Sequence, residues 1–340
     1  MIERFSVKNF KCLVDVDVRL EPFNVLIGEN DTGKSSFLEA LIWFSDVIQD
    51  QGNMKKSFDD LCWKKTDFPG AALFEAQGRH SRKPGKKFTQ KVSIRCSSLK
   101  GPFGVGIEHQ GEPAPPVGEH VAKYELSASR LASDSPEKES QESGLETDGF
   151  GLPSVLAQVL LSDRERFDLI ESQLHELVPQ IHRLILATPK RGRKSLSFKL
   201  TGTDWEIPAK QMSDGVLLLL GYLTLANMSS WPDVLLVEEP EKGVHPRRLK
   251  DIVVLLRKMS EKGANRPPVQ VVLTTHSPYL LDFVKRDEVL VFIRNPDHSV
   301  QVTPLRNRDD LDEKLGDQDF TLGELWFNEG EEKLVGGAAG

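Results

Sequence analysis

One octapeptide, residues 28–35, constrains the fold of this 340-residue chain more than any other feature. It reads Gly-Glu-Asn-Asp-Thr-Gly-Lys-Ser, follows the apolar run 23–27 and precedes an amphipathic pattern over 37–44. It matches G-x-x-x-x-G-K-[ST] in the strand-loop-helix context that this motif requires. A glycine-rich turn that only caps a helix is the alternative, but it leaves most of the match unexplained. The octapeptide therefore predicts a loop that binds the phosphates of a nucleotide.

The residue types in this loop suit phosphate chemistry. Glycines let backbone N–H groups surround the α- and β-phosphates, and the ammonium group of Lys34 can reach the β- and γ-phosphates. The hydroxyl of Ser35 is placed to bind Mg²⁺. We therefore expect ATP and Mg²⁺ to bind here. The expected nucleotide contacts are Asn30, Asp31, Thr32, Gly33, Lys34, Ser35 and Ser36.

Composition limits the classes of partner. Hydrophobic residues make up 39% of the chain, which is enough for a sizeable core. The formal charge of −7 argues against unspecific adhesion to nucleic acid over the whole surface. Local basic clusters nevertheless occur at 64–65, 83–87 and 190–194, and such clusters are usually solvated faces.

Cysteine usage and hydropathy indicate a reducing compartment. The three cysteines are widely separated and suggest neither a disulfide framework nor a zinc cluster. No signal-like segment opens the chain, and its most apolar stretch, 216–228, is too short to cross a bilayer. We therefore expect a cytoplasmic protein without a membrane partner.

Strand patterns dominate the first part of the chain. Residues 2–7, 14–20 and 23–27 have strand-like patterns. Between 71 and 129, short β-like runs are separated by Gly, Pro and Lys, which predicts an antiparallel meander. These runs are 73–76, 88–95, 103–108 and 121–126.

The middle of the chain is predicted to be helical. Few bulky apolar residues occur in 127–151, so we expect a mobile loop there. Helical patterns follow at 154–161 and 164–187, and the second places apolar residues on one core-facing side. These residues are Phe167, Ile170, Leu174, Leu177, Ile181 and Leu184.

The last third alternates between strand and helix patterns. Such alternation predicts an α/β fold with a mostly parallel sheet, in which ligands bind at the carboxyl ends of the strands. Gly28, Glu239 and His276 all fall at such ends. The predicted strands are 234–238, 269–275, 288–294 and 300–305, and the helices are one from about 214, one over 246–262 and one from 278.

Two carboxylates follow the apolar run 234–237. Side chains at the tip of a buried strand have little freedom, so one carboxylate can hold Mg²⁺ while the next orients or deprotonates an attacking water. We assign Glu238 to the metal and Glu239 to the water. In isolation, acidic residues after a strand more often cap a helix or face solvent, and it is the upstream phosphate loop that favours catalysis.

Two further segments carry polar groups at helix starts. His276 precedes Ser277-Pro278, and from that strand tip its imidazole can hydrogen-bond a γ-phosphate, although a structural histidine is the alternative. The catalytic candidates are thus Lys34, Glu239 and His276. Ser213 and Gly215 precede an apolar helix and can form an anion-binding start, although local sequence alone favours an ordinary helix cap.

The order of these motifs resembles the ABC-type ATPase heads of the SMC, RecF and OLD group. The opening 7–13 and the tail 322–326 resemble, more closely, the small stand-alone bacterial ATPases often labelled AAA family or misnamed SMC proteins. The resemblance covers nearly the whole chain. Its motifs are the phosphate loop, Ser-Asp-Gly at 213–215, Val-Glu-Glu-Pro-Glu-Lys-Gly-Val-His-Pro at 237–246 and Thr-Thr-His-Ser-Pro-Tyr-Leu-Leu-Asp at 274–282.

The resemblance implies an α/β P-loop NTPase of the ABC-ATPase head type, with a mixed sheet core, an antiparallel β subdomain and a helical signature lobe. The nucleotide lobe would comprise 1–126 and 230–340, followed in the fold by the mobile loop 127–151 and the helical lobe 152–229. In a homodimer that forms around ATP, Ser213 and Gly215 would contact the γ-phosphate bound by the partner. His276 would be the switch histidine.

Three departures from the group's motifs stand out. Glu238 occupies the place of the usual metal-binding aspartate, His245 that of the D-loop aspartate of transporter heads, and Asp214 that of a signature glycine. The glutamine of the Q-loop has no clear counterpart between 125 and 158. The sequences Glu-Glu-Pro-Glu at 238–241 and Thr-His-Ser-Pro at 275–278 argue against a transporter subunit.

The leading hypothesis is a slow ATPase, converting ATP and water to ADP and phosphate, that acts on DNA or on a partner effector in genome maintenance or anti-phage defence. The alternative is a nucleotide-gated scaffold that controls a toxin or nuclease encoded nearby and does not bind DNA. The acidic cluster 309–313 lacks further metal ligands, so cleavage would come from a partner. The aromatic tail 322–327 either docks a partner or, more simply, packs on the head.

Overall fold

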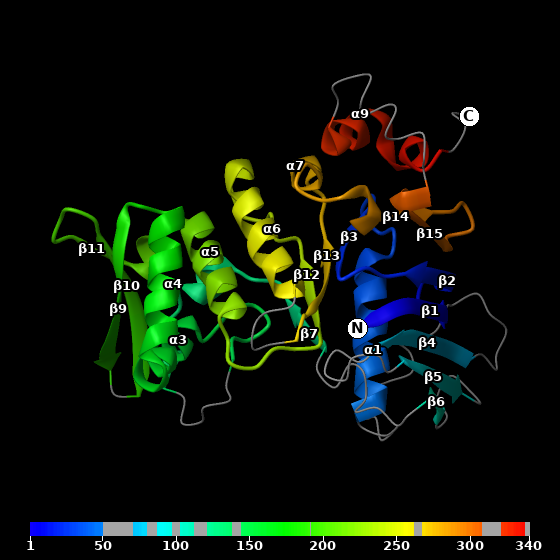
Figure 1. The fold of residues 1–340 in the computed structure, drawn as a ribbon, viewed down its shortest axis with the longest axis horizontal. Coiled ribbons are helices and arrows are strands. Elements are labelled where there is room, and N and C mark those ends of the chain that lie inside the picture. The colour runs from blue at the N-terminus through cyan, green and yellow to red at the C-terminus, as the bar shows by residue number, and fades with distance from the viewer. Residues whose placement is uncertain are drawn as a thin grey trace. The chain divides into compact units, whose positions relative to one another are not determined.

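A computed structural model describes residues 1–49, 71–79, 87–96, 103–111, 121–137, 144–190, 192–261, 267–307 and 321–336. The basic clusters at 64–65 and 83–86 and the acidic cluster 309–313 lie outside the described residues. The chain forms two compact units (Figure 1). The first comprises 1–122, 232–238 and 259–340, and the second comprises 123–231 and 239–258.

The central sheet of the first unit has the order β15-β14-β3-β13-β12-β7. Its strands β3 and β13 are buried along their whole length, as apolar strands inside a parallel sheet are. The strand before the phosphate loop therefore lies in the middle of the sheet. Parallel pairing joins β3 (Phe23–Ile27), β13 (Gln270–Thr274), β12 (Val234–Glu238) and β14 (Val289–Arg294), whereas β15 (Val300–Pro304) runs antiparallel to β14.

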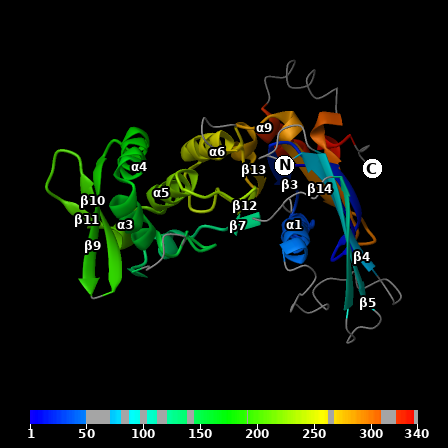
Figure 2. The ribbon, with the colours of Figure 1, turned by 60° about the horizontal axis from the view of Figure 1, so that its bottom comes forward.

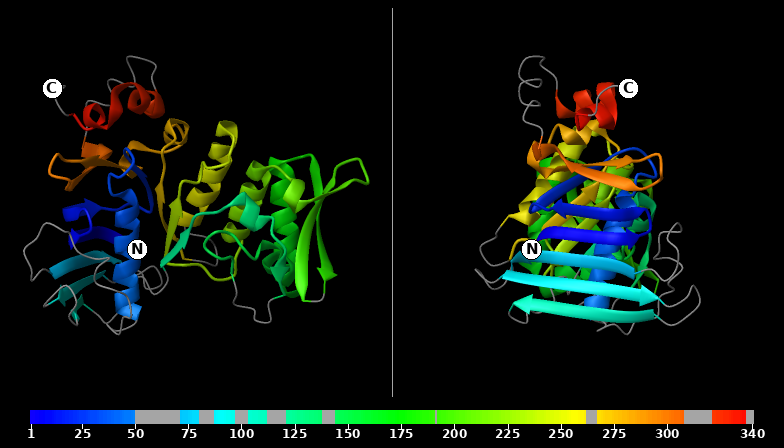
Figure 3. Two further views of the ribbon diagram at one scale, coloured as in Figure 1. Left: turned by 180° about the vertical axis from the view of Figure 1, so that it is seen from behind. Right: turned by 90° about the vertical axis from the view of Figure 1, so that its right-hand side faces the viewer.

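An antiparallel sheet with the order β2-β1-β4-β5-β6 completes the unit (Figure 3). It confirms the strands predicted at 2–7 and 14–20, and the meander as far as residue 111. The strands are β1 (Ile2–Phe10), β2 (Leu13–Arg19), β4 (Ala71–Arg79), β5 (Lys87–Cys96) and β6 (Phe103–Gly111).

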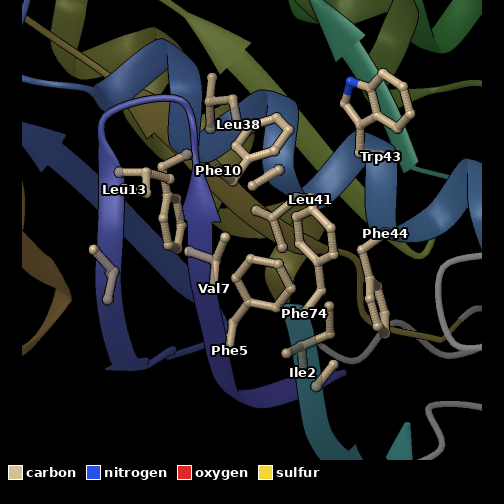
Figure 4. Close-up of a cluster of buried hydrophobic side chains, with 14 of the residues drawn as sticks. Ile2, Phe5, Val7, Phe10, Leu13, Leu38, Leu41, Trp43, Phe44 and Phe74 are labelled. Carbon is tan, nitrogen blue, oxygen red and sulfur yellow. The ribbon is translucent and has the colours of Figure 1, made fainter. Parts of the chain in front are cut away.

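Helix α1 (Lys34–Gln49) supplies much of the core between the sheets. Phe5 meets Phe37 and Phe44 edge-to-face, with ring centroids 5.7 Å apart in each pair. Phe10 meets Phe74 at 5.4 Å, and Figure 4 shows Phe5, Phe10, Phe44 and Phe74 in this cluster. Edge-to-face aromatic pairs of this kind add stabilisation beyond the area that they bury. The helix that follows the phosphate loop is thereby held firmly against the first strand of the chain.

One predicted strand has a different partner from the one expected. The pattern at 121–126 predicts a continuation of the meander, but β7 (Val121–Tyr124) pairs with β12 at the edge of the central sheet. Alternation in a sequence identifies a strand without specifying its neighbour, because any free sheet edge offers the same hydrogen-bonding groups. The prediction of the strand was right and that of its sheet was wrong.

The second unit combines helices with a small sheet in which β10 pairs with β8, β9 and β11 (Figure 2). Its helices are α2 (Ala128–Leu131), α3 (Leu152–Ser162), α4 (Arg164–Leu177), α5 (Asp214–Ala226) and, for the most part, α6 (Pro246–Ser260). Its strands are β8 (Ser135–Pro136), β9 (Ile181–Lys190), β10 (Arg193–Leu200) and β11 (Glu206–Pro208), and η2 (Ala209–Gln211) is a 3₁₀ turn.

The predicted helix 164–187 is wrong in its second half. α4 ends at Leu177, and β9 begins at Ile181. Pro179 lacks the N–H that a continuing helix needs, so the chain leaves the helix there. Ile181 and Leu184 fit a helical stripe, yet both are buried from a strand, because β9 finds a full antiparallel partner in β10.

The expected mobile loop 127–151 is structured in its described parts, 127–137 and 144–151. Leu131 and Leu145 are buried, and Ser127 donates its backbone N–H to the carbonyl of Asp148 at 2.9 Å. The guanidinium of Arg130 also donates to the Asp148 carboxylate at 2.5 Å. A few well-placed contacts thus order the described parts of a segment whose average composition predicts disorder.

The segment 239–258, predicted to lie in the nucleotide lobe, belongs by its contacts to the second unit. Part of the physical reason is Arg248, whose guanidinium donates to the carbonyl of Leu177 at 2.5 Å. One of the points where the chain passes from one unit to the other therefore falls between Glu238 and Glu239.

The C-terminal helix α9 (Leu322–Leu334) packs on α7 (Pro278–Leu281) in the first unit. A Thr321–Glu324 capping box starts α9, and Gly323 donates its N–H to the Asp282 carboxylate at 3.2 Å. Leu325 and Trp326 are buried, which confirms the simpler interpretation of the tail for these two residues. The 3₁₀ turns η3 (Arg286–Glu288) and η4 (Leu305–Asn307) flank β14 and β15. None of the helices in the described ranges is both long and apolar enough to span a bilayer.

Candidate functional site

The loop 28–33 connects β3 to α1 with a backbone that only certain residues can adopt. Gly28 has φ +145° and Gly33 has φ +90°, and Asp31 between them has φ +61°. A Cβ atom at Gly28 would lie 2.4 Å from the carbonyl oxygen of Phe292 on β14. The neighbouring strand therefore leaves no room for a side chain, and glycine is required both for the conformation and for the space.

Lys34 and Thr32 lie inside the loop, each 5% exposed. The ammonium group of Lys34 donates to the carbonyls of Gly28 at 2.8 Å and Glu29 at 2.7 Å, and Thr32 donates its hydroxyl to the Glu29 carbonyl at 2.8 Å. The lysine is thus held where the loop curves around it. A positive charge buried among backbone groups at a helix N-terminus is suited to bind an anion.

Two residues outside the motif support the loop. Arg294, the last residue of β14, donates to the carbonyl of Asp31 at 3.0 Å. Cys12 Sγ lies 3.5 Å from the hydroxyl of Ser36 and would lie 2.8 Å from a Cβ atom at Gly33. Sequence reasoning missed both residues, because no local pattern indicates that β14 and the β1–β2 turn lie next to the loop.

Replacing Gly28 with alanine is expected to lower the melting temperature markedly. The Cβ atom would clash with Phe292 in a backbone conformation that alanine disfavours, a loss of about 2–4 kcal/mol. Gly202→Ala is the matched control, because Gly202 has φ +71° and a Cβ atom added there would have no neighbour within 4 Å. Equal melting temperatures for the two variants, measured by circular dichroism, would contradict the close packing at Gly28.

Glu238 and His276 lie at the same edge of the central sheet as the loop. In the sheet, Thr274 of β13 pairs with Glu238 of β12 on one side and with Leu26 of β3 on the other. Glu238 therefore lies at the same height in the sheet as Leu26, two residues before the phosphate loop begins at Gly28. Two strand spacings separate these backbones, about 10 Å. His276 follows directly after Thr275, whose N–H donates to the carbonyl of Leu26 at 3.1 Å. The first unit thus brings together the phosphate loop, Glu238 and His276.

The donor set at this edge fits a magnesium ion that is shared with phosphate. Ser35 offers a hydroxyl and Glu238 a carboxylate, and Mg²⁺ prefers such oxygen donors, with the remaining positions filled by water and substrate oxygens. Within the described ranges no three His, Cys, Asp or Glu side chains are grouped so as to hold a metal ion alone.

The second unit holds the other predicted site residues. Ser213 is the N-cap residue of α5 by position, but its side chain makes no cap hydrogen bond, and the residue is exposed. The helix-cap interpretation therefore does not account for its hydroxyl. Gly215, one residue into the helix, would bring a Cβ atom to 3.8 Å from the carbonyl of Gly243, an ordinary contact.

Glu239 has an unusual backbone and a charged neighbour. Its φ of +44° is rare for a residue with a side chain, and such strain is concentrated at functional sites. Its carboxylate lies 3.1 Å from the ammonium group of Lys242, which also lies 3.3 Å from the carboxylate of Glu125. The hydrogen bond to Glu239 raises the pKa of Lys242 above its ordinary value. Lys242 thus remains charged between two carboxylates.

A cavity of about 620 Å³ opens beside these residues within the second unit. Its lining mixes charges of both signs, including Glu125, Arg130, Asp148, Asp214 and Lys242. The mixture gives no clear preference for an anion or a cation.

Comparison with known proteins places the chain among ATPase domains. A family model described as "AAA domain, putative AbiEii toxin, Type IV TA system" matches residues 23–282. A relative named OLD nuclease, from Thermus scotoductus, is 23% identical over 359 aligned positions, which cover 91% of this chain and 65% of the relative. The chain thus spans slightly less than two thirds of that relative's length.

Proposed function

The chain belongs to the AAA-domain family with this description, and from that premise we propose that it binds ATP in the loop 28–36 and hydrolyses it to ADP and phosphate. The observation that carries the proposal is the conformation of this loop, where backbone and space both require glycine around the buried Lys34. Lys34 would contact the β- and γ-phosphates. Backbone and side-chain groups of Asn30, Asp31, Thr32, Gly33, Ser35 and Ser36 would surround the remaining phosphate oxygens.

Further residues would complete the reaction. Ser35 and Glu238 would hold Mg²⁺, which when bound offsets the negative charge of the phosphates. Glu239 would orient the attacking water and accept its proton, and His276 would hydrogen-bond the γ-phosphate. Two observations support these roles. Glu238 and His276 lie at the sheet edge that carries the loop, and Glu239 has a strained backbone.

We further propose that the reaction requires an ATP-dependent homodimer with the architecture of an ABC-type head. The exposed hydroxyl of Ser213, which is not used to cap its own helix, and Gly215 would bind the γ-phosphate held by the other copy. The γ-phosphate would then join two surfaces, and its release would separate them.

A mixing experiment tests the dimer. Lys34→Ala and Ser213→Ala should each be inactive alone. Mixed in equal amounts, they should regain up to about a quarter of wild-type turnover, since half of the dimers pair one of each and carry one intact site. Phosphate release is the measurement. Ser162→Ala, which changes another exposed serine of the second unit, should stay active. A mixture without turnover, together with wild-type activity that is independent of concentration, would rule out the shared site.

The biological role follows as a further proposal. The similarity to an OLD nuclease supports an action on DNA, directly or through a partner effector, in genome maintenance or anti-phage defence. The family description, which names a putative toxin, supports the second candidate, a nucleotide-gated scaffold that holds or releases a toxin or nuclease. Co-purification from the native host with and without ATP would identify the partner.

A further inference from the structure

The segment 181–210 differs sharply in charge from the rest of the chain. It contains seven lysines and arginines and only two acidic residues, whereas the whole chain has a formal charge of −7. The segment comprises β9, β10, β11 and the turns between them, all in the second unit. A concentration of positive charge on an acidic protein needs an explanation beyond average composition.

The register of the sheet places the cations on one face. Residues directly opposite each other share a face, and Arg183 lies opposite Lys199, as Lys190 lies opposite Arg193. The register shifts between Arg193 and Ser195, where β9 has one extra residue, so the face of Lys190 follows from its partner Arg193, which lies two positions before Ser195 on β10. Leu184, Leu196 and Phe198 belong to the other face and are buried. Helices α3 and α4 contact this sheet, as the ribbon in Figure 2 shows. Lys194 also points inward and pairs with Glu137 at 2.9 Å. Arg183, Lys190, Arg193 and Lys199 therefore belong to the opposite, outer face.

Like charges directly opposite each other destabilise a sheet unless something compensates for them. Elsewhere in the described chain the compensation is visible: Arg79 faces Lys87 across β4 and β5, but Arg79 also pairs with Glu3 at 2.8 Å. On the outer face, Lys199 pairs with the exposed Asp204 at 3.2 Å and lies opposite Glu206 of β11, and Arg193 donates to the backbone carbonyl of Asp134 at 2.7 Å. For Arg183 and Lys190 no carboxylate among the described residues lies within ion-pair distance, and both are exposed. The positive charges of Arg183, Lys190 and Arg193 are therefore not offset by a carboxylate of the described residues, and they are available to an anionic partner.

The pairs Arg183–Lys199 and Lys190–Arg193 form two cationic rows across β9 and β10. Only small or medium-sized side chains share the outer face between these rows, namely Ile185, Ala187, Ser195 and Ser197. The rows are six residues apart along β10, about 20 Å, which equals the length of roughly six base pairs of duplex. A repeating line of phosphates can meet both rows at once, whereas a single small anion can meet only one.

We propose that the outer face of β9 and β10 binds the phosphate backbone of duplex DNA. Arg183, Lys190 and Arg193 supply the phosphate contacts, without reading base sequence. This inference deepens the DNA-directed form of the proposed function, and it names the surface that DNA would occupy. The phosphate loop lies in the first unit, whereas β9 and β10 lie in the second, so nucleotide binding and DNA binding can be tested separately.

The experiment measures binding of a short fluorescein-labelled duplex to the full chain by fluorescence anisotropy, at several salt concentrations between about 50 and 200 mM. The Arg183→Gln, Lys190→Gln double variant should bind about 10-fold or more weakly at low salt. Its slope of log affinity against log salt should fall by about 2, since each lost phosphate contact removes close to one counterion.

The matched control is Arg79→Gln, Lys87→Gln. It removes the same charge from another cross-strand pair of exposed cations, in the first unit, and should bind DNA as the wild type does. ATP turnover without DNA should be unchanged in both double variants, so a loss of DNA binding alone tests the surface. Absence of ATP turnover in the wild type would instead contradict the proposed function.

Two results would overturn the proposal. The first is an equal loss of binding in both double variants, because that would show a response to net charge only. The second is a preference for single-stranded DNA that Trp205→Ala abolishes. Trp205, in the turn before β11, is 73% exposed and could stack on unpaired bases, so this result would assign the site to single strands.

Discussion

Lys34→Ala is expected to reduce ATP turnover at least about 100-fold, the effect typical of removing a single group that stabilises developing charge in an active site. The ammonium group is almost completely buried and held by the carbonyls of Gly28 and Glu29. Alanine leaves these carbonyls without their donor and the phosphates without their cation. Phosphate release under saturating ATP measures the loss, and binding of a fluorescent ATP analogue shows how much of it reflects affinity.

The matched control for this variant is Lys8→Ala. Lys8 lies in the same unit, on β1, and pairs with Asp15 at 3.0 Å on the surface, so its removal should leave turnover unchanged. Melting temperatures of both variants establish that they are folded. A folded Lys34→Ala protein with wild-type turnover would show that the loop 28–35 is not the site of hydrolysis.

Glu239→Gln is expected to slow hydrolysis by about 10²–10⁴-fold while ATP binding persists. The amide has nearly the shape of the carboxylate but cannot take a proton from water. With ATP still bound, the proposed dimer should accumulate, and light scattering after size-exclusion chromatography with ATP and Mg²⁺ would detect it. A monomer under these conditions would contradict the ATP-dependent dimer, and wild-type turnover of the variant would contradict the role of Glu239.

Glu125→Gln is the matched control for Glu239→Gln. Both carboxylates lie within 3.3 Å of the ammonium group of Lys242, so each variant removes one negative charge from the same lysine. Of these two residues, Glu239 alone has a left-handed backbone, and it follows directly after the strand β12. If Glu125→Gln slows turnover as much as Glu239→Gln does, the effect belongs to the charge of Lys242 and not to the activation of water.

Local sequence predicted the parts of the site that depend on neighbours in the chain. The loop 28–35 is identified by its own glycines and lysine, because a backbone that curves around phosphate needs those residue types at that spacing. Strands β3 and β12 were predicted with their correct ends, since an apolar run inside a parallel sheet is nearly continuous. The alternation of strand and helix patterns predicted the α/β class, and the ends of the predicted strands gave the expectation that Gly28, Glu239 and His276 lie at one edge of the sheet.

Long-range pairing decided the rest. The choice between helix and strand at 181–187 depended on the partner strand β10, and the sheet that β7 joined depended on the free edge of β12. The support of the loop by Arg294 and Cys12, and the row of cations across β9 and β10, arise where segments distant in sequence meet. The chain's order of residues determines periodicity and motif, but the contact of one segment with another is settled only by the packing free energy of the whole fold.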